Sequence, residues 1–447
     1  MVDSRQLQQR LAPVLRTGPA TFDGKVVFFG LHGFILDVLI DAFNTEFFRL
    51  PKAQAVGRYR RRMDNALGPG AVPVDHIEAL HDLGYLPLHI KALPEGSLVD
   101  IKVPPFTVTE TLPQFFWLTN YIETVLSNAN WKPMTVATLA YQYRRLLEAY
   151  GDMTGGDPLF IDWQAHDFSA RGMAGPEDAA RSGAGHLLSF TGTDTVNAID
   201  YLEDFYGANS DTEMIGGSIP ATEHSVMSMG GQLDELGTFR RLITEVYPAG
   251  LVSIVSDTWD FWQVITDYAV QLKAEILARQ PNALGQAKVV FRPDSGDPVL
   301  ILTGYLDDEL VSDAQGQPRR DADGLYEVRE GSRRITDAER RGAVQCLWDV
   351  FGGTTTSKGF KVLHERVGLI YGDSITLQRA DAILRRLMAK GFASTNVVLG
   401  VGSFSYQFIT RDSFGMARLA AEMQTGGVGL YRRDGFVHLD CGPARRW

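Results

Sequence analysis

The sequence predicts an α/β protein in which a partial (β/α) barrel follows a second, smaller α/β domain on the N-terminal side. Two observations support this fold class. From about residue 158 onward, apolar β-like runs alternate with helical segments, which is the pattern of βα units. Before that residue, helical periodicity surrounds a few short β-rich pieces broken by proline and glycine. An open, doubly wound sheet has the same periodicity and is the competing topology.

The N-terminal domain is expected over residues 1–150. Residues 28–48, FFGLHGFILDVLIDAFNTEFF, repeat apolar side chains at helical spacing and predict an amphipathic core helix. Residues 86–111 are rich in β-forming residues and predict a small antiparallel sheet. Residues 115–127 and 136–150 predict two further helices. A cluster of Gly, Asp and Pro that follows the second of them marks the expected domain boundary.

The barrel domain is expected over residues 151–412, and a divergent tail over 413–447. Seven apolar runs in this domain each end in a small polar cluster. Because the carboxyl ends of the strands of a parallel barrel meet at one mouth, these polar ends should converge. A polar insertion at 307–341 is predicted to be a surface excursion without a catalytic role. The seven runs are FIDWQAHDFSARG, HLLSFTGTDT, GGSIPATEH, GLVSIVSDTWD, AKVVFRPDSGD, VGLIYGDSIT and NVVLGVGSFS.

The polar ends of these runs supply residue types that suit a phosphorylated sugar. Arginine beside backbone amides near helix starts binds phosphate, and clustered carboxylates suit Mg²⁺ or sugar hydroxyls. Each residue taken alone is better explained as a helix cap or a turn, so the prediction rests on their recurrence at seven run ends. The residues are Asp167, Phe168, Arg171, Gly192, Thr193, Asp194, Glu223, His224, Asp257, Arg292, Asp294, Gly372, Asp373, Gly400 and Gly402.

His224 is the candidate for proton transfer or nucleophilic catalysis. It follows a short extended run in GGSIPATEHSVMSMG, where Thr222, Glu223 and Ser225 are residue types that cap the first turn of a helix. A histidine at such a junction exchanges protons near neutral pH, or acts as a nucleophile, if a carboxylate fixes the tautomer of its ring. The alternative is a capping histidine that bonds only to the backbone.

Composition argues against several classes of function. The formal net charge of −11 is the opposite of what a nucleic-acid binder needs, and the basic run at 58–62 is predicted to be a solvated helix face. The two cysteines, Cys346 and Cys441, lack metal-ligand spacing, so neither a disulfide nor a zinc site is predicted. The N-terminus lacks the apolar core of a signal peptide, and no window reaches transmembrane length. A cytoplasmic protein without membrane contact is therefore expected.

Six segments of the chain resemble signature segments of the nicotinamide phosphoribosyltransferase family, and residues 115–138 are similar to its N-terminal helical region. The resemblance runs in order from about Phe28 to Asp412. It implies a homodimer with active sites at the interface, each subunit joining a partial β/α barrel to a smaller α/β domain. The implied reaction transfers the phosphoribosyl group of phosphoribosyl pyrophosphate to nicotinamide, giving nicotinamide mononucleotide and pyrophosphate in NAD salvage. The segments are HDFSARG, FTGTDTV, SIPATEHSVM, VSDTWD, VVFRPDSGDP and GDSIT.

The resemblance also implies residue roles. Phe168 would stack on the pyridine ring, Arg171 would help to hold the base and phosphate, and Asp194 would accept a hydrogen bond from the carboxamide. His224 matches the histidine that the family phosphorylates with ATP, Asp257 matches its carboxylate partner, and Mg²⁺ would absorb the charge of the leaving pyrophosphate. The implied catalytic residues are His224, Asp257, Asp294 and Glu223, with no metal ligands assigned. The implied substrate-binding residues are Phe168, Arg171, Asp194, Ser218, Arg292, Gly372, Asp373, Gly402, Ser403 and Arg411.

The chain departs from the family pattern at both ends. Before Phe28 it has neither the tyrosine that stacks on the base from the partner subunit nor the phosphate-binding arginine after it, and residues 426–447 replace a lysine-rich phosphate-binding tail. Weak substrate binding is therefore expected. Two alternatives stay open, a nicotinate phosphoribosyltransferase of the same fold and a catalytically impaired relative that acts as a binding or dimerisation protein. Asp194 distinguishes the first alternative, because a carboxylate accepts from an amide NH₂ and repels a second carboxylate.

Overall fold

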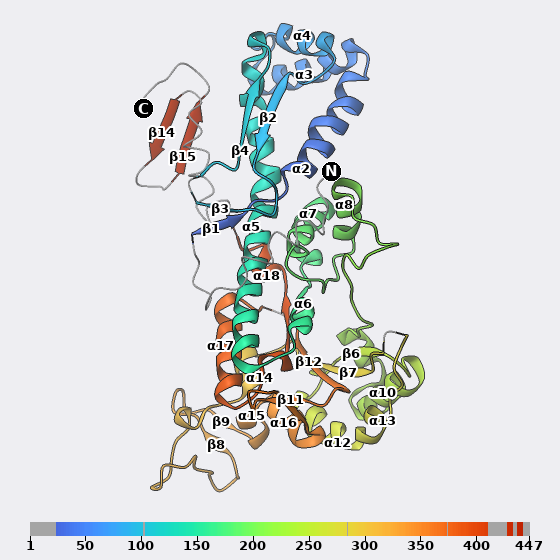
Figure 1. The fold of residues 1–447 in the computed structure, drawn as a ribbon, viewed down its shortest axis with the longest axis vertical. Coiled ribbons are helices and arrows are strands. Elements are labelled where there is room, and N and C mark those ends of the chain that lie inside the picture. The colour runs from blue at the N-terminus through green and yellow to red at the C-terminus, as the bar shows by residue number, and fades with distance from the viewer. Residues whose placement is uncertain are drawn as a thin grey trace.

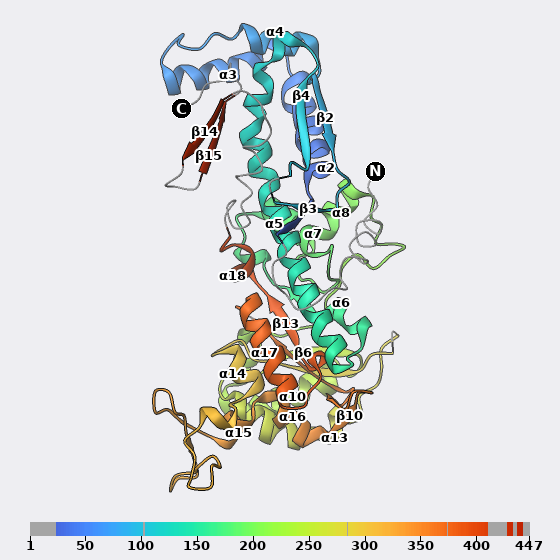
Figure 2. The ribbon, with the colours of Figure 1, turned by 60° about the vertical axis from the view of Figure 1, so that its left-hand side comes forward.

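The computed structural model describes residues 24–101, 103–283, 285–372 and 374–409, and the backbone of the strands β14 (Gly427–Tyr431) and β15 (Phe436–Asp440). The molecule is elongated, with the N-terminal elements at one end and the barrel at the other (Figure 1). The long helix α5 (Trp117–Thr154) runs from the first part into the second, as Figure 2 shows from another side. The barrel and its mouth are therefore connected to the N-terminal elements by a continuous helix.

Two antiparallel strand pairs and a set of helices form the N-terminal part. β1 (Lys25–Val27) pairs with β3 (Leu98–Asp100), and β2 (Leu88–Ala92) pairs with β4 (Phe106–Glu110), which confirms the antiparallel pairing predicted for 86–111. The predicted helix at 28–48 is also confirmed, except that it begins at Leu31. Phe28 and Phe29 are buried and extended beside β1, where Phe28 N donates to Ser97 O at 2.9 Å. The helical elements are α2 (Leu31–Phe34), η1 (Ile35–Ala42), η2 (Asn44–Phe48), α3 (Lys52–Leu67) and α4 (Asp75–Leu83).

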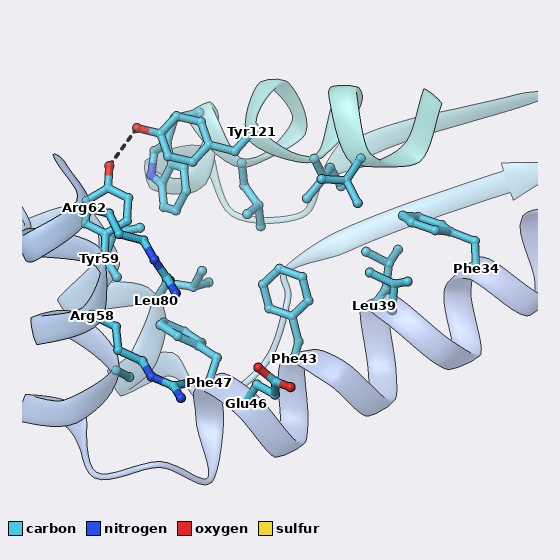
Figure 3. A pocket seen from close by; sticks show the side chains of 17 residues that line it. Phe34, Leu39, Phe43, Glu46, Phe47, Arg58, Tyr59, Arg62, Leu80 and Tyr121 are labelled. Atoms are coloured by element: carbon cyan, nitrogen blue, oxygen red, sulfur yellow. Dashed lines mark hydrogen bonds between the residues drawn. The ribbon is translucent and has the colours of Figure 1, made fainter. Parts of the chain in front are cut away.

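These helices and the start of α5 surround an apolar cavity of about 410 Å³ (Figure 3). Its walls include Phe34, Phe43 and Leu80, while Arg58 and Arg62 stand at one end. The basic run at 58–62 thus lies on two sides of α3. Arg60, Arg61 and Arg62 are exposed, as predicted for a solvated face, but Arg58 and Arg62 also line the cavity.

The prediction of two separate helices at 115–127 and 136–150 is wrong, because one 38-residue helix, α5, covers both. Pro133 lies inside it, at a position where proline normally ends a helix. Packing overrides this tendency, since α5 is buried between other elements around the proline. On one side Val27 N of β1 donates to Thr138 Oγ1 at 3.0 Å. On another, the backbone of Pro133 lies so close to Gly185 that a Cβ there would be 2.8 Å from the Pro133 carbonyl oxygen.

Five parallel strands form the barrel sheet in the order β5 (Ala165–Asp167), β13 (Val398–Val401), β12 (Val367–Tyr371), β7 (Lys288–Arg292) and β6 (Leu251–Val255). Single parallel bridges continue the ladder from β5 back to β6. They join Asp167 to Thr193, Gly192 to Gly217, and Ala221 to Ser253. The ladder therefore closes on itself, which confirms the predicted barrel and contradicts the open, doubly wound sheet.

The second and third of the seven runs enter the barrel only through these single bridges and do not form full strands. HLLSF is the last residue of α7 (Pro176–His186) and the turn after it. Leu187 and Leu188 pack into a core with residues of α5 and of α8 (Asn197–Tyr206), away from the barrel sheet. An apolar run of this length is compatible with a strand or with a buried helix end. Here it forms a helix end because its leucines pack against α5 and α8.

Further helices cover the barrel, and the polar insertion lies outside them. The predicted surface excursion at 307–341 is confirmed; it contains β8 (Tyr326–Glu327), β9 (Arg334–Ile335) and α15 (Asp337–Arg341) at the end of the molecule far from the N-terminal part (Figure 1). It has its own small core around Tyr326 and Ile335. The covering helices include α10 (Glu235–Arg241), α14 (Pro298–Thr303), α16 (Ala343–Phe351) and α17 (Leu377–Ala389).

Glu235, the first residue of α10, makes the stability of the fold depend on pH. Its carboxyl group is buried, and neither oxygen has a hydrogen-bond partner among the described residues. Burial, followed by the charge of Asp260, raises the pKa of Glu235 from 4.5 to about 7. An acid whose pKa rises on folding stabilises the protein below its unfolded pKa, and this contribution is lost as the pH rises through the folded pKa.

We therefore expect the free energy of unfolding to fall between about pH 4.5 and 7, and Glu235→Gln to remove most of this fall. The Gln variant should be the more stable of the two at about pH 8, because it has no carboxyl group to ionise. Urea unfolding of both proteins across this range measures the effect, with the exposed Glu245→Gln as matched control. An identical pH dependence in parent and Glu235→Gln would contradict the assignment.

Candidate functional site

His224 and Asp257 form a hydrogen-bonded pair at the mouth of the barrel. His224 is the first residue of the short helix α9 (His224–Met227), and its Nε2 lies 3.1 Å from Asp257 Oδ1. The other oxygen, Asp257 Oδ2, accepts from the backbone N–H groups of Asp294 at 2.9 Å and Ser295 at 2.8 Å. Since an ionised carboxylate only accepts hydrogen bonds, Asp257 selects the tautomer with hydrogen on Nε2 and leaves the lone pair on Nδ1 of His224.

The surroundings of His224 exclude the capping alternative. Its ring bonds to a side chain of the next strand end, while the His224 side chain is 47% exposed and that of Asp257 only 6%. The predicted cap residues do not cap α9 either. Glu223 makes no side-chain cap, and the Thr222 hydroxyl instead accepts from Val255 N at 2.9 Å. His224 is thus exposed for reaction on one edge and oriented by a buried carboxylate on the other.

Arg292 is the buried cation of the mouth. Its Nη2 donates to Thr222 O at 2.8 Å and lies 3.8 Å from Glu223 Oε1, and its Nε lies 3.4 Å from Asp294 Oδ1. Burial raises the pKa of Asp294, and the nearby Arg292 charge opposes that rise. Gly372 closes the space beside this carboxyl group, because a Cβ at that position would be 2.1 Å from Asp294 Oδ1. The arrangement concentrates one positive and several negative groups where a charged substrate could bind.

Asp294 is a carboxylate of the mouth that could contribute an oxygen to Mg²⁺. Its Oδ1 is buried and accepts no hydrogen bond from the described residues, but it lies 3.4 Å from Arg292 Nε, so a metal ion would have to displace this ion pair to bind there. Within the described ranges, no three His, Cys, Asp or Glu side chains are grouped closely enough to hold a metal ion. Mg²⁺ commonly binds through one or two carboxylates together with substrate phosphates, and a single carboxylate suits that mode.

Asp194 lies at the neighbouring end of the mouth. Its Oδ1 is 2.9 Å from His166 Nε2 and also accepts from the Ser218 hydroxyl. Burial alone would raise the pKa of Asp194, but hydrogen bonds from His166 and Ser218 and the charge of Arg292 hold it below its ordinary value. The ring of Phe168 packs against the imidazole of His166, with ring centres 4.5 Å apart. A carboxylate and an aromatic ring, the two groups that recognition of an aromatic amide requires, thus both adjoin His166 and line one cavity.

A cavity of about 450 Å³ leads from these residues into the barrel. Phe168, Asp194 and Arg292 line one end of it, and Lys288 and Arg366 line the other. Because Lys288 and Arg292 are the first and last residues of β7, the cavity follows this strand along its whole length. Its volume is in the range of small-molecule sites.

Three of the remaining predicted site residues lie on two loops that touch each other. Arg171 is exposed in the turn η5 (Ala170–Gly172), and Gly402 and Ser403 begin the helix α18 (Ser403–Tyr406). The two loops touch, because a Cβ on Gly172 would be 2.2 Å from Ser403 Oγ. Asp373 and Arg411 lie outside the described residues.

His166 is the site residue that the sequence prediction missed. His166 lies within the predicted run FIDWQAHDFSARG and precedes Phe168 by two positions. Side chains two apart on a strand share a face, so the proposed position of Phe168 already implied that His166 faces the mouth.

The chain is 58% identical over 408 residues to the nicotinamide phosphoribosyltransferase of Acinetobacter baylyi, a match that covers 91% of this chain and 75% of that protein. It is 34% identical over 351 residues to the nicotinamide phosphoribosyltransferase of Mycoplasma pneumoniae, covering 77% of this chain and 66% of that protein. A crystal structure of human nicotinic acid phosphoribosyltransferase aligns with 90% of this chain and 72% of that chain, with a TM-score of 0.44 and 17% identity.

A separate, short similarity of 57% over 30 residues relates 7% of the chain to 16% of the peptidoglycan L,D-endopeptidase MepK of Escherichia coli, and a match of that length shows no family. The profile of the Nicotinate phosphoribosyltransferase (NAPRTase) family matches residues 163–429. Together with the Acinetobacter relative, this match shows that the chain belongs to the nicotinate phosphoribosyltransferase family.

Proposed function

We propose that the chain transfers the phosphoribosyl group of phosphoribosyl pyrophosphate to nicotinamide, giving nicotinamide mononucleotide and pyrophosphate in NAD salvage. The observation that carries the choice of base is Asp194, a carboxylate held beside Phe168 at the mouth of the cavity. The two bacterial relatives described above carry the name of the same enzyme. The reaction predicted from the sequence is thus also the reaction for which the relatives are named.

In the proposed reaction, the ring nitrogen of nicotinamide bonds to C1 of ribose while the bond from C1 to the pyrophosphate oxygen breaks. Phe168 holds the pyridine ring, and Asp194 accepts from its carboxamide. Asp294 and Glu223 place negative charge near the cationic ribose centre, and Arg292 holds phosphate oxygens. Bound Mg²⁺, with Asp294 as one ligand, would supply positive charge that stabilises the leaving pyrophosphate.

Incubation of the purified chain with phosphoribosyl pyrophosphate, Mg²⁺ and either base tests this function directly. Formation of nicotinamide mononucleotide supports the proposal, and faster formation of nicotinate mononucleotide would favour the nicotinate alternative. If neither product forms while the bases still bind, the chain is the catalytically impaired relative instead. Millimolar substrate, on the order of a typical upper KM, is the starting condition.

We also propose that ATP phosphorylates His224 on Nδ1, the nitrogen that Asp257 leaves unbonded. The lone pair of Nδ1 attacks the γ-phosphorus, an N–P bond forms, and ADP leaves. Phosphohistidine would add negative charge beside Arg292 and Asp294, where it could couple ATP use to phosphoribosyl transfer.

Asp257→Asn should remove most of the labelling of His224 by γ-labelled ATP while the fold is kept. The amide cannot hold the ring as a carboxylate does, because its NH₂ group donates to Nε2 and so favours the other tautomer. Acid-labile label on the parent, on Asp257→Asn and on His224→Ala is the measurement, and exposed Asp234→Asn is the matched control. Equal labelling of the parent and His224→Ala would show that His224 is not the phosphorylated residue.

We further propose a cytoplasmic homodimer. Several apolar side chains that lie within nine positions of His224 or Asp257 in the sequence are exposed in the single chain, and a second subunit would cover them; they are Met229, Leu233 and Trp259. No helix in the described part of the chain is long and apolar enough to cross a membrane. Light scattering of the purified chain tests the dimer.

A further inference from the structure

His166 contacts both side chains on which recognition of the base depends in the proposed function. It is the middle residue of β5, and Phe168 follows two positions later. The two rings have centres 4.5 Å apart at an interplanar angle of 38°. The imidazole Nε2 lies 2.9 Å from Asp194 Oδ1. A single side chain therefore adjoins the aromatic surface and the carboxylate at once.

The two oxygens of Asp194 have different surroundings. Oδ1 receives hydrogen bonds from His166 Nε2 and the Ser218 hydroxyl, which together occupy its two lone-pair directions. None of the described residues donates a hydrogen bond to Asp194 Oδ2. The Asp194 side chain lines the cavity of about 450 Å³. Oδ2 is thus the oxygen available to a ligand.

Packing prevents the imidazole from moving away from Asp194. His166 is buried, and Gly192 from the neighbouring part of the ladder passes directly beside it. A Cβ on Gly192 would be 2.8 Å from His166 Nδ1, so only glycine leaves room for the ring in this place. The position of Gly192 is fixed in turn by the buried His186, whose Nε2 lies 3.1 Å from the Gly192 carbonyl oxygen.

We propose that His166 is a positioning residue that determines base specificity, because it fixes Asp194 in the orientation that presents Oδ2 to the carboxamide of the base. The inference rests on the proposed function and names a residue that acts through Asp194, without touching the reacting atoms. Without the imidazole donor, Ser218 alone holds Oδ1, and the carboxylate can rotate. The amide NH₂ then loses a fixed acceptor, and a nicotinate carboxylate no longer meets a fixed negative charge.

The test compares His166→Leu, which removes the donor, with His166→Gln, whose amide nitrogen can reach the place of Nε2. Hydrogen bonds to charged groups account for about tenfold to hundredfold in affinity, so His166→Leu should raise the KM for nicotinamide by about that factor with little change in kcat. Its preference for nicotinamide over nicotinate should narrow by a similar factor. His166→Gln should recover most of both losses.

The same replacement in an Asp194→Ala background decides whether His166 acts through Asp194. If it does, His166→Leu adds no further change to KM or preference once the acceptor of its hydrogen bond is gone. An equal loss in both backgrounds, or a Gln variant no better than Leu, would overturn the inference. Exposed His89→Leu is the control for loss of a histidine as such, and Gly192→Ala, which crowds the ring without removing it, should mimic His166→Leu.

Calorimetry measures the affinity of the protein for nicotinamide and for nicotinate without requiring phosphoribosyl transfer. A parent that binds nicotinamide selectively but makes no mononucleotide contradicts the proposed function, and the comparison of His166 variants can then be read from binding alone. A parent that binds both bases equally contradicts the inference about His166. If His166→Leu does not fold, Gly192→Ala takes its place, and the base preference of Gly192→Ala is compared with that of His166→Gln.

Discussion

Asp194→Asn is expected to lose most of the preference for nicotinamide over nicotinate. In the parent, hydrogen bonds from His166 and Ser218 hold the pKa of Asp194 below its ordinary value, so the carboxylate is charged at neutral pH. A second carboxylate about 4 Å away is repelled by roughly 4 kcal/mol at an effective dielectric constant near 20, which is on the order of a thousandfold. Asn keeps the shape of the side chain and removes the charge, so use of nicotinamide should fall and use of nicotinate should rise.

Competition between the two bases, measured on the parent and the variant under the same conditions, gives the preference ratio directly. Asp200→Asn is the matched control, because Asp200 is an exposed residue of the neighbouring helix α8. If the ratio for Asp194→Asn equals that of the parent, Asp194 has only a structural role at the strand end and selectivity lies elsewhere.

Arg292→Ala should show the second large effect, a loss of at least a hundredfold in kcat/KM. The substitution removes a charge-assisted donor for phosphate and also the cation that neutralises Asp294 and Glu223. Because the Arg292 side chain is only 7% exposed, breaking this arrangement should also reduce the free energy of unfolding by about 3 kcal/mol. Steady-state kinetics and urea unfolding measure the two effects.

Arg292→Lys separates charge from geometry in this prediction. Lysine keeps the positive charge but cannot reach Thr222 O and both carboxylates with a planar fork, so it should recover stability more than activity. Arg240→Ala, which breaks an exposed ion pair with Glu275, is the control and should change neither quantity much. Unchanged kcat/KM in Arg292→Ala would remove Arg292 from the site.

The local pattern of the chain was enough to predict the barrel, but not the helix end at HLLSF or the continuity of α5. β6, β7 and β12 lie inside their predicted runs because each is a continuous apolar stretch followed by Asp, Arg or Gly. HLLSF has the same local composition, but it forms the end of α7 and the turn after it, because Leu187 and Leu188 pack into a core with residues of α5, about 50 positions earlier, and of α8. The continuity of α5 across Pro133 has the same cause, since burial from several elements outweighs the local preference.

The sequence was enough to predict which residues lie together at the site, but not the hydrogen bonds that join them. His224, Asp257 and Arg292 end consecutive parallel runs, so the topology alone places them together. The pairing of His224 with Asp257 was implied by the family resemblance. The sequence alone does not specify side-chain orientations. It therefore did not predict that both oxygens of Asp257 accept hydrogen bonds, or that His166 bonds to Asp194.

The closing contact of the barrel has a consequence for synthesis of the chain in the cell. β5 pairs with β13, whose residues follow it by about 230 positions. Because ribosomes add about 5–20 residues per second, β5 waits on the order of ten to fifty seconds for this partner to be made. Throughout that interval the nascent barrel has an unpaired edge at β5, and unpaired edges favour association with other chains. Chaperone occupancy on translating ribosomes should therefore persist until β13 has emerged from the exit tunnel.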